Sequence, residues 1–412
     1  MGFANMNQRY LLIPFLIYGV PNVLGFASII AFDVLIVDMF PIVKWMDNSD
    51  VFVAFLAVLA SFGLLYFLLR TSLGFFEGRR GGKPLKAIEA IGKIVFALQL
   101  LTLTAAIFID YGRAGGEPTP VSILAVLASY AKADFLFLLY YSHARPGSFP
   151  KYNLLAYIAS NTIRGWSGFW LILFLVESYY FFYRSDKRYK IQIPAICLLL
   201  AMLAVPAVGD LKNKMRGSEV EVASTGYLEA YVRLLNRLQH VTNVSLIAQN
   251  TAEIREKYAA EKISPWYAYN RIARRIFGIS EDSVALERHL VSEYIINLDY
   301  LGRHSSDLGW DTNPGIAGWL FVIEWHQIPI YILYISALIC APYVLISRYL
   351  GATSMIPVAH AASFVFALHG WIGVQLEFVL AVASYVLLTR FLHYVVAVND
   401  YSNRRRGTAY AP

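Results

Sequence analysis

Long apolar runs recur along nearly the whole chain of 412 residues, with short polar segments between them. A helix needs about 20 mostly apolar residues to cross a membrane core about 30 Å thick, and most of these runs approach or exceed that length. The pattern predicts membrane-spanning helices at 11–35, 51–70, 87–110, 120–143, 191–208, 319–347, 353–369 and 374–396. The sequence therefore predicts an all-α, polytopic membrane protein.

The apolar run at 154–183 is interrupted by the sequence from Arg164 to Gly168, RGWSG. The sidedness of the other spans requires this run to leave one side of the membrane and return, but it is too short for two full crossings. Two half-membrane helices joined at the interruption satisfy both conditions, since irregular backbone is tolerated at membrane depth when protein or water surrounds it. One long tilted helix is the alternative. With the half-helices counted, about ten hydrophobic helices are expected.

The spacing of polar segments divides the chain into three parts. Residues 1–208 are predicted to form an N-terminal transmembrane bundle, and 317–412 the C-terminal transmembrane helices with a short basic tail. Residues 209–316 between them are predicted to form a large, mostly helical loop domain outside the membrane. Within it, apolar residues recur at helical spacing from 227 to 244.

Composition supports a membrane protein, since 58% of the residues are hydrophobic and only 15% charged, against about 25% charged in soluble domains. The net charge of +7 is concentrated in short loops at 79–86 and 184–190 and at Arg404–Arg406. Such segments face the cytoplasm. We therefore expect a multi-pass protein of the bacterial inner membrane, with the C-terminus cytoplasmic and the loop domain periplasmic. Nucleic-acid binding is a poor interpretation of this charge pattern.

Charged residues inside spans are candidates for function because the bilayer penalises them unless something holds them. The candidates are Lys132 and Asp134, the isolated Arg164, and Glu324 with His326. Lys132 and Asp134 can also simply neutralise one another, and Glu324 and His326 can simply mark an interface. A guanidinium such as that of Arg164 is suited to hold a phosphate through two hydrogen bonds.

The predicted loop domain carries further basic residues in helical rows and in one polar loop. Each row suits a diphosphate, but each can equally be an ordinary solvated face. The rows comprise Arg233, Arg237 and His240, and then Arg271, Arg274 and Arg275. The segment 301–318 is rich in Gly, Ser, Asp and Asn and lies just before a span, and such loops often bind polar ligands. It contains Arg303, His304, Asp307 and Asp311.

Several other chemistries lack their sequence motifs. The chain has no Walker lysine, no HExxH, no CxxC pair and no GxSxG elbow, which disfavours an ATP-driven pump and a zinc protease. The two cysteines, Cys197 and Cys340, lie in apolar runs and not at metal-ligand spacing. We expect neither a metal nor another cofactor.

The chain resembles the bacterial O-antigen or oligosaccharide repeat-unit polymerases of the Wzy type. The resemblance rests on NTIRGWSGFWLILFLVESYY, on the earlier span with KAD, on TNPGIAGWL, and on the late position of the loop domain. It implies an inner-membrane glycosyltransferase that polymerises undecaprenyl-diphosphate-linked oligosaccharide units on the periplasmic face. It also implies the lipid bilayer and a Wzz-type chain-length regulator as partners.

The resemblance further implies which residues act, because family members hold the diphosphate with periplasmic arginines and the related O-antigen ligases add a histidine. Arg164, Arg237 and Arg303 best match these arginines. A base for the acceptor hydroxyl is sought among His304, Asp307, Asp311 and Glu324, a choice that the sequence leaves open. The expected substrate-binding residues are Arg233, Arg271, Arg275, Lys132, Glu324 and His326.

Two rival functions stay open. An O-antigen ligase would use the same lipid-linked donor but transfer the glycan once, to a different acceptor lipid. A secondary transporter or flippase of lipid-linked saccharides would also explain the spans and the buried charges, although no internal repeat of the kind common in transporters is evident.

Overall fold

The computed structural model describes 12–36, 41–43, 45–76, 87–112, 122–144, 151–165, 168–184, 235, 237–260, 263, 265, 286 and 314–408. Within these residues the chain is mostly helical, as predicted. A two-stranded antiparallel hairpin is the exception, formed by β1 (Val34–Ile36) and β2 (Pro41–Val43) with Leu35 opposite Ile42. The predicted span 191–208 lies outside the described residues.

Within the part of the chain that the structure describes, six helical segments are long and apolar enough to cross a membrane, which supports the predicted α-helical membrane protein. They are Pro14–Phe32, Asn48–Phe76, Ile88–Phe108, Ile123–Ala144, Trp325–Leu350 and Ile372–Val396. The helices within them are α1 (Leu12–Phe32), α2 (Asn48–Leu73), α3 (Ile88–Phe108), α4 (Ile123–Ala131), α5 (Ala133–Ala144), α15 (Ile328–Leu345) and α17 (Ile372–Thr408). The remaining α-helices are α6 (Lys151–Ile163), α7 (Gly168–Arg184), α10 (Val241–Gln249), α11 (Thr251–Ala259), α14 (Gly315–Val322) and α16 (Ile356–His369).

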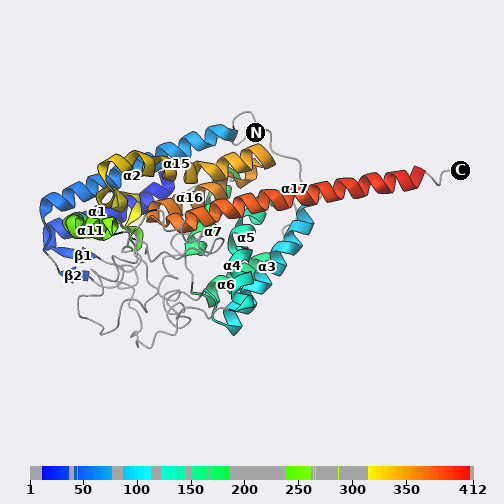
Figure 1. The fold of residues 1–412 in the computed structure, drawn as a ribbon, viewed down its shortest axis with the longest axis horizontal. Coiled ribbons are helices and arrows are strands. Elements are labelled where there is room, and N and C mark those ends of the chain that lie inside the picture. Colours follow the sequence, from blue (N-terminus) through cyan, green and yellow to red (C-terminus); the bar gives the residue numbers. More distant parts are fainter. Residues whose placement is uncertain are drawn as a thin grey trace.

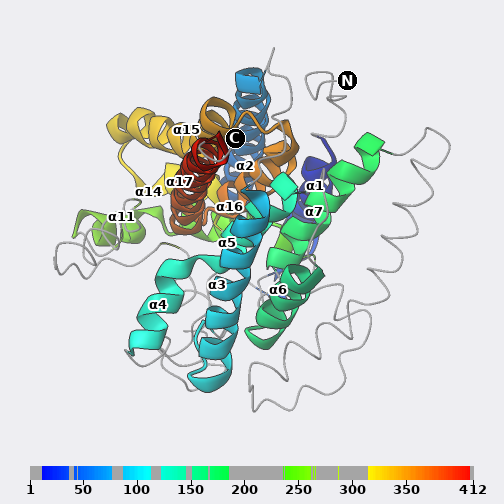
Figure 2. The ribbon, with the colours of Figure 1, turned by 90° about the vertical axis from the view of Figure 1, so that its right-hand side faces the viewer.

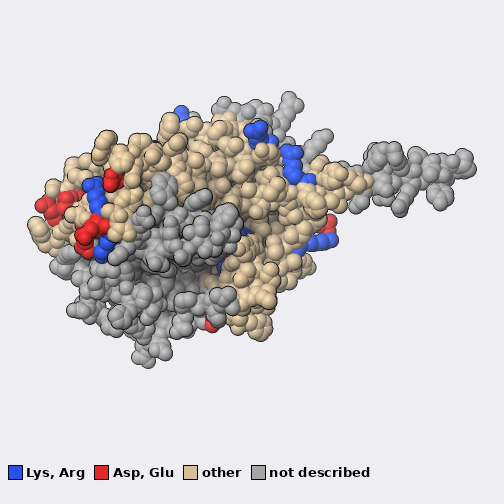
Figure 3. All heavy atoms as spheres, in the orientation of Figure 1, with Lys and Arg blue, Asp and Glu red and all other residues tan. Residues whose placement is uncertain are grey.

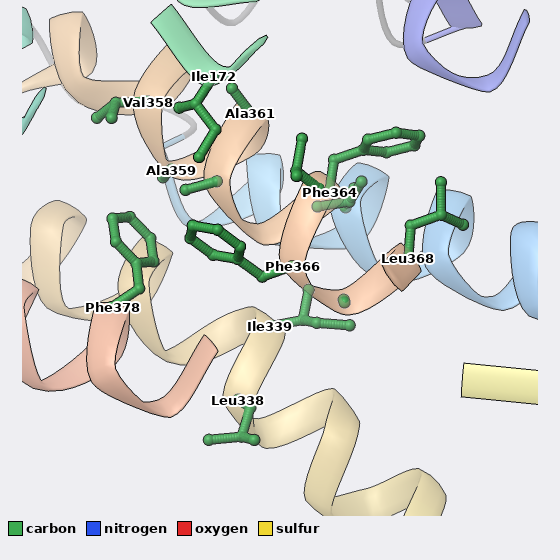
Figure 4. Packing of buried hydrophobic residues seen from close by; sticks show 14 of the residues in the cluster. Ile172, Leu338, Ile339, Val358, Ala359, Ala361, Phe364, Phe366, Leu368 and Phe378 are labelled. Atoms are coloured by element: carbon green, nitrogen blue, oxygen red, sulfur yellow. The ribbon is translucent and has the colours of Figure 1, made fainter. Parts of the chain in front are cut away.

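The bundle is built around α16, which is buried along its whole length. The helices α2, α15 and α17 run roughly along the long axis of the molecule (Figure 1), and α7 packs against α16. A second group is formed by α3 with α4, α5 and α6 (Figure 2). Around α16, buried side chains from three other helices contribute to one hydrophobic cluster: Ile172 lies beside Ala361, and Phe378 lies near Phe366 with Ile339 below it (Figure 4).

The outer surface matches a lipid environment. Large apolar side chains such as Phe67, Leu333 and Leu387 are more than half exposed, which is costly in water but not in hydrocarbon. On the face seen in Figure 3, the described charged side chains gather toward the ends of the long axis, with uncharged surface between them.

Several helix ends follow from local sequence. Asp47 caps α2 by accepting a hydrogen bond of 2.7 Å from the backbone N–H of Ser49, and Ser122 caps α4 in the same way. Proline in the first turn begins both α15 and α16. The end of α16 is set by Gly370, whose φ of +75° is a left-handed conformation that glycine adopts readily.

The structure divides three of the predicted helical segments. The span predicted at 120–143 is broken at Lys132, between α4 and α5. The span predicted to start at 319 is corrected as well, since α14 ends at Val322 and α15 begins only at Ile328. The run 154–183 forms α6 and α7, which end and begin on either side of the RGWSG segment. The division into two helices matches the first interpretation, and the alternative of one long helix is therefore wrong.

The segment predicted as one helix from 227 to 244 is also interrupted. Helical backbone at Arg237 and Leu238 stops before Gln239 and His240, and α10 starts at Val241. In addition, α10 is buried against α2, α1 and α14. The range predicted as the loop domain thus includes a helix that packs within the bundle.

Candidate functional site

Two ion pairs meet where α4, α6 and α17 approach the start of α5. We call their residues, with Asn161, the arginine cluster: Lys132, Asp134, Asn161, Arg164 and Glu377. Nη2 of Arg164 lies 2.6 Å from Oδ2 of Asp134, and Nζ of Lys132 lies 2.9 Å from Oε1 of Glu377. Lys132 and Asp134 therefore do not simply neutralise each other, because each pairs with a different helix.

Arg164 is held by contacts from its own helix as well as by Asp134. Its Nε donates to the backbone carbonyl of Ser160 at 3.2 Å, and its Nη2 also donates to Oδ1 of Asn161 at 3.3 Å. Asn161 in turn donates to Asp134 at 2.9 Å. Because the side chain of Arg164 is only 8% exposed, these partners offset the large cost of removing a guanidinium from water.

The described hydrogen bonds of Arg164 use Nε and Nη2 and do not involve Nη1. Gly112 lies beside this part of the side chain, where an added Cβ would be 3.4 Å from Cδ of Arg164. The φ of Gly112 is +67°. A glycine at this position therefore provides a left-handed backbone conformation beside Arg164.

The helix breaks place the N-termini of α5 and α7 close in the chain to the two cations of this cluster. Lys132 has a φ of +43° and separates α4 from α5, which begins at the next residue. Arg164 lies just after α6 and four residues before the start of α7 at Gly168. Helix N-termini carry partial positive charge and unpaired N–H groups. The C-termini of α4 and α6 lie at the same breaks, and each cation has a carboxylate partner, so an anion would bind here by displacing Asp134 or Glu377.

A second polar group is buried where α1, α10 and α16 meet. We call it the histidine cluster: Tyr18, Asn22, His240 and His369. The Tyr18 hydroxyl lies 2.8 Å from Nε2 of His369, and Nδ1 of His369 lies 3.4 Å from Nε2 of His240. Burial lowers the pKa of the His240 imidazole to about 3, so His240 is neutral at physiological pH. With a pKa this far below physiological pH, the imidazole is a weak base and serves as a hydrogen-bonding group.

Backbone packing places these two histidines. Oδ1 of Asn22 accepts hydrogen bonds from the backbone N–H groups of His240, at 2.8 Å, and Val241, at 3.0 Å. These bonds satisfy the start of α10 and anchor it to α1. At the end of α16, a Cβ at Gly370 would lie 2.8 Å from the carbonyl oxygen of Gly315. Only glycine permits this approach, which brings α14 against His240.

Trp371 packs against His369 and against the start of α7. Its ring stacks on His369 with centroids 4.7 Å apart. On the other side, a Cβ at Gly168 would lie 3.8 Å from the Trp371 ring, and Gly168 begins the helix that follows Arg164. Trp371 therefore connects the histidine cluster to the start of α7, the helix that follows Arg164 in the chain.

Arg237 is the other predicted catalytic residue that the structure describes. It is half-buried and lies three residues before His240, and its charge interacts with the His369 imidazole. The structure thus associates Arg237 with the histidine cluster, and Arg164 and Lys132 with the arginine cluster. The remaining predicted arginines and the polar loop fall outside the described residues: Arg233, Arg271, Arg275, Arg303, His304 and Asp307.

Glu324 and His326 are described but have a different environment. Oε2 of Glu324 lies 3.2 Å from Nδ1 of His326, and both side chains are more than half exposed. They lie in the break between α14 and α15, where Tyr258 donates to Gln327 at 2.6 Å. No described contact joins them to either cluster, so the prediction that they bind substrate gains no support from this geometry.

Sequence reasoning grouped His240 with the arginines of its row but did not anticipate its contact with His369. The two are 129 positions apart, and His369 ends an otherwise apolar run, which is its one visible signal. Among the residues that the structure describes, no three His, Cys, Asp or Glu side chains are grouped as a metal site. Comparison of the chain with protein-family models, with curated proteins and with solved structures finds no match.

Proposed function

We propose that the protein is a bacterial inner-membrane glycosyltransferase that polymerises undecaprenyl-diphosphate-linked oligosaccharide repeat units on the periplasmic face. The observation that carries the proposal is the arginine cluster, with a buried Arg164 and a second cation, Lys132, at helix breaks inside an apolar bundle. Charges at such positions are costly and mark substrate sites in membrane proteins. A diphosphate attached to a lipid is an anion that would reach such a site from the bilayer.

In this proposal the cluster stabilises the leaving group. Transfer breaks the bond between the anomeric carbon and the diphosphate oxygen, so negative charge develops on the diphosphate. Arg164 and Lys132, together with the N-termini of α5 and α7, would stabilise that charge in a poorly hydrated site without a metal ion. Asp134 and Glu377 hold the two cations in place before substrate binds, which reduces reorganisation during the reaction.

The histidine cluster would shape the acceptor side of the site. The acceptor hydroxyl attacks the anomeric carbon and must pass its proton to a base. The pKa of His240, about 3, is too low for that role, so the base is sought among the predicted His304, Asp307 and Asp311. Trp371 lies beside His369 and offers a flat apolar surface on which a sugar ring can stack. In this scheme the diphosphate binds on the Arg164 side and the acceptor sugar on the His369 side.

The direct test is an assay of product size. Purified protein in nanodiscs is incubated with undecaprenyl-diphosphate oligosaccharide from its host, with a chelator present. A ladder of multiples on the lipid carrier would support a metal-independent polymerase. Unchanged substrate, with folded protein verified by size-exclusion chromatography, would contradict the proposal.

Arg164→Lys tests the role of the arginine cluster within that assay. Lysine keeps the positive charge that Asp134 needs but cannot make the paired hydrogen bonds of a guanidinium to phosphate. We expect at least a hundredfold loss of rate with the protein still folded. Arg70→Lys, at an exposed arginine in the last turn of α2, is the matched control and should keep full activity.

A transporter or flippase of lipid-linked saccharide is the second candidate, and the broken helices favour it. Transporters often bind anionic groups at the N-termini of discontinuous helices near the middle of the membrane. A flux assay with fluorescent lipid-diphosphate saccharide in proteoliposomes separates the candidates, since a polymerase changes the length of the glycan and a flippase changes only its side. An O-antigen ligase is distinguished by a single transfer to a different acceptor lipid.

A further inference from the structure

Two arginines from different helices share one tyrosine ring at the far end of α15. Cζ of Arg348 lies 5.9 Å from the centroid of the Tyr349 ring, and Cζ of Arg390 lies 5.8 Å from the same centroid. Arg390 on α17 also donates to the backbone carbonyl of Tyr349 from Nε, at 3.2 Å, and from Nη2, at 2.9 Å. Both guanidinium groups are therefore associated with the same aromatic ring.

An irregular helix end creates this arrangement. After Leu345 the chain continues as a π-helix over Ile346–Leu350, which ends at Gly351 with a φ of +61°. This wider turn is rare in proteins and is often found at functional sites. Ser347 fixes the other side of the turn by donating to the carbonyl of Phe75, at 2.9 Å.

Neither arginine has an anionic partner among the residues that the structure describes. The buried Arg164 and Lys132 each have a carboxylate within 3 Å, whereas no described carboxylate pairs with Arg348 or Arg390. Two positive charges beside one ring leave a local excess of positive charge, which a bound anion would neutralise. The described hydrogen bonds of Arg390 use Nε and Nη2, and Arg348 makes none within this part of the chain.

The position of the pair indicates where that anion comes from. Arg348 lies two residues from the end of the candidate span Trp325–Leu350, and Arg390 lies six residues, or about 9 Å, from the end of Ile372–Val396. This depth corresponds to the boundary between the acyl chains and the headgroups. Tyr349, Phe391 and Tyr394 are each more than 40% exposed there, and aromatic rings of this kind are enriched at that boundary.

We propose that Arg348, Tyr349 and Arg390 form a binding site for the phosphate of an anionic glycerophospholipid. The two guanidinium groups bind the phosphate oxygens, and the exposed aromatic side chains contact the upper part of the acyl chains. The site lies on the α15–α17 face of the bundle (Figure 1), and its argument does not depend on the glycosyltransferase proposal.

Thermal unfolding of the full chain in mild detergent tests the proposal. Phosphatidylglycerol should raise Tm at low concentration, and phosphatidylcholine should not. Arg348→Gln with Arg390→Gln should weaken the apparent affinity for phosphatidylglycerol about fivefold for each arginine removed, with little change in Tm without lipid. Arg70→Gln, at an exposed arginine on α2 with no described aromatic partner, should keep the wild-type response.

Two results would overturn the proposed lipid site. A response to phosphatidylglycerol that Arg70→Gln weakens as much as the double variant would show general surface charge and would overturn the site. An equal rise of Tm with inorganic phosphate would overturn the lipid assignment in favour of a soluble phosphate. If the double variant does not fold, Arg348→Gln alone, which removes no described hydrogen bond, should give the fivefold change.

Discussion

The buried Arg164 and the exposed pair Arg348 and Arg390 place the same side chain in two opposite environments. Arg164 is only 8% exposed and lies 2.6 Å from a carboxylate on another helix. Arg348 and Arg390 are exposed near the end of a span and have no described carboxylate partner, only a tyrosine ring and a backbone carbonyl. The protein thus supplies a counter-charge where water is excluded and omits it where headgroups are within reach.

This difference between the arginines has a physical reason, which is the cost of a charge in each environment. Inside the bundle, a charge without a partner would be several kcal/mol too costly to keep. At the membrane boundary, long side chains reach water or lipid phosphate at little cost. An anionic ligand must therefore compete with Asp134 for Arg164, but would meet no such competitor at Arg348 and Arg390.

Asp134→Ala should have the largest effect on stability, because it leaves Arg164 buried without its counter-charge. We expect a loss of about 3–5 kcal/mol, seen as a collapse of the monodisperse peak in size-exclusion chromatography. The double variant Asp134→Asn with Arg164→Gln removes both charges and should recover folded protein. If Asp134→Ala alone is as stable as the wild type, the buried Arg164 does not need a carboxylate partner, and the contrast with Arg348 and Arg390 does not hold.

Glu377→Gln should have a smaller effect, because Lys132 and Glu377 are 25% and 32% exposed and water screens their attraction. We expect a loss of about 1 kcal/mol, measured as a modest fall in Tm. The double variant Lys132→Glu with Glu377→Lys exchanges the two charges and should restore most of the lost Tm. If Glu377→Gln lost as much stability as Asp134→Ala, the burial of an ion pair would not determine how much it contributes to stability.

His240 extends the comparison to a buried group that is kept neutral. Its native pKa is about 3 and its unfolded pKa about 6.5, so below pH 6.5 the unfolded state binds a proton that the native state does not. The free energy of unfolding should therefore decrease as the pH is lowered from about 6.5 toward 3. Tm should fall more between pH 7.5 and 5.5 in the wild type than in His240→Asn. An equal fall in both proteins would remove His240 as a cause.

Lys93→Ala should have the smallest effect. Its ion pair with Glu89 spans 3.2 Å, but the two side chains are 76% and 78% exposed, and exposed pairs contribute little. Tm in detergent should be unchanged within error, as it should be for Arg348→Gln without lipid. A clear fall in the Tm of Lys93→Ala would show that the ion pair between Lys93 and Glu89 stabilises the protein more than its high exposure indicates.

The sequence predicted helix positions correctly where the length of an apolar run alone determines the helix. The predicted span 87–110 is nearly the same as α3, and 353–369 contains the whole of α16. The break at Arg164 was also visible, because glycines and a charge interrupted an apolar run. The break at Lys132 was not, since a lysine flanked by alanines carries no backbone signal for a left-handed conformation.

The candidate site was predictable only in part. Arg164 and Lys132 attracted attention because charges are rare in spans, but their partners could not be assigned. Asp134 lies 30 positions from Arg164 and Glu377 lies 245 positions from Lys132, distances that no local pattern relates. His369 was missed for the same reason, since its partners Tyr18 and His240 come from two remote segments.

The sequence by itself determined that the chain is a membrane protein and where most of its helices lie, because both follow from the length of apolar runs and from local signals such as Asp47, Ser122 and Gly370. The tertiary structure alone decided which charges are paired and which are exposed. Ion pairs between helices depend on how the helices pack, and packing arises from the shapes of many buried side chains together. The contrast between Arg164 and Arg390 is therefore a property of the fold.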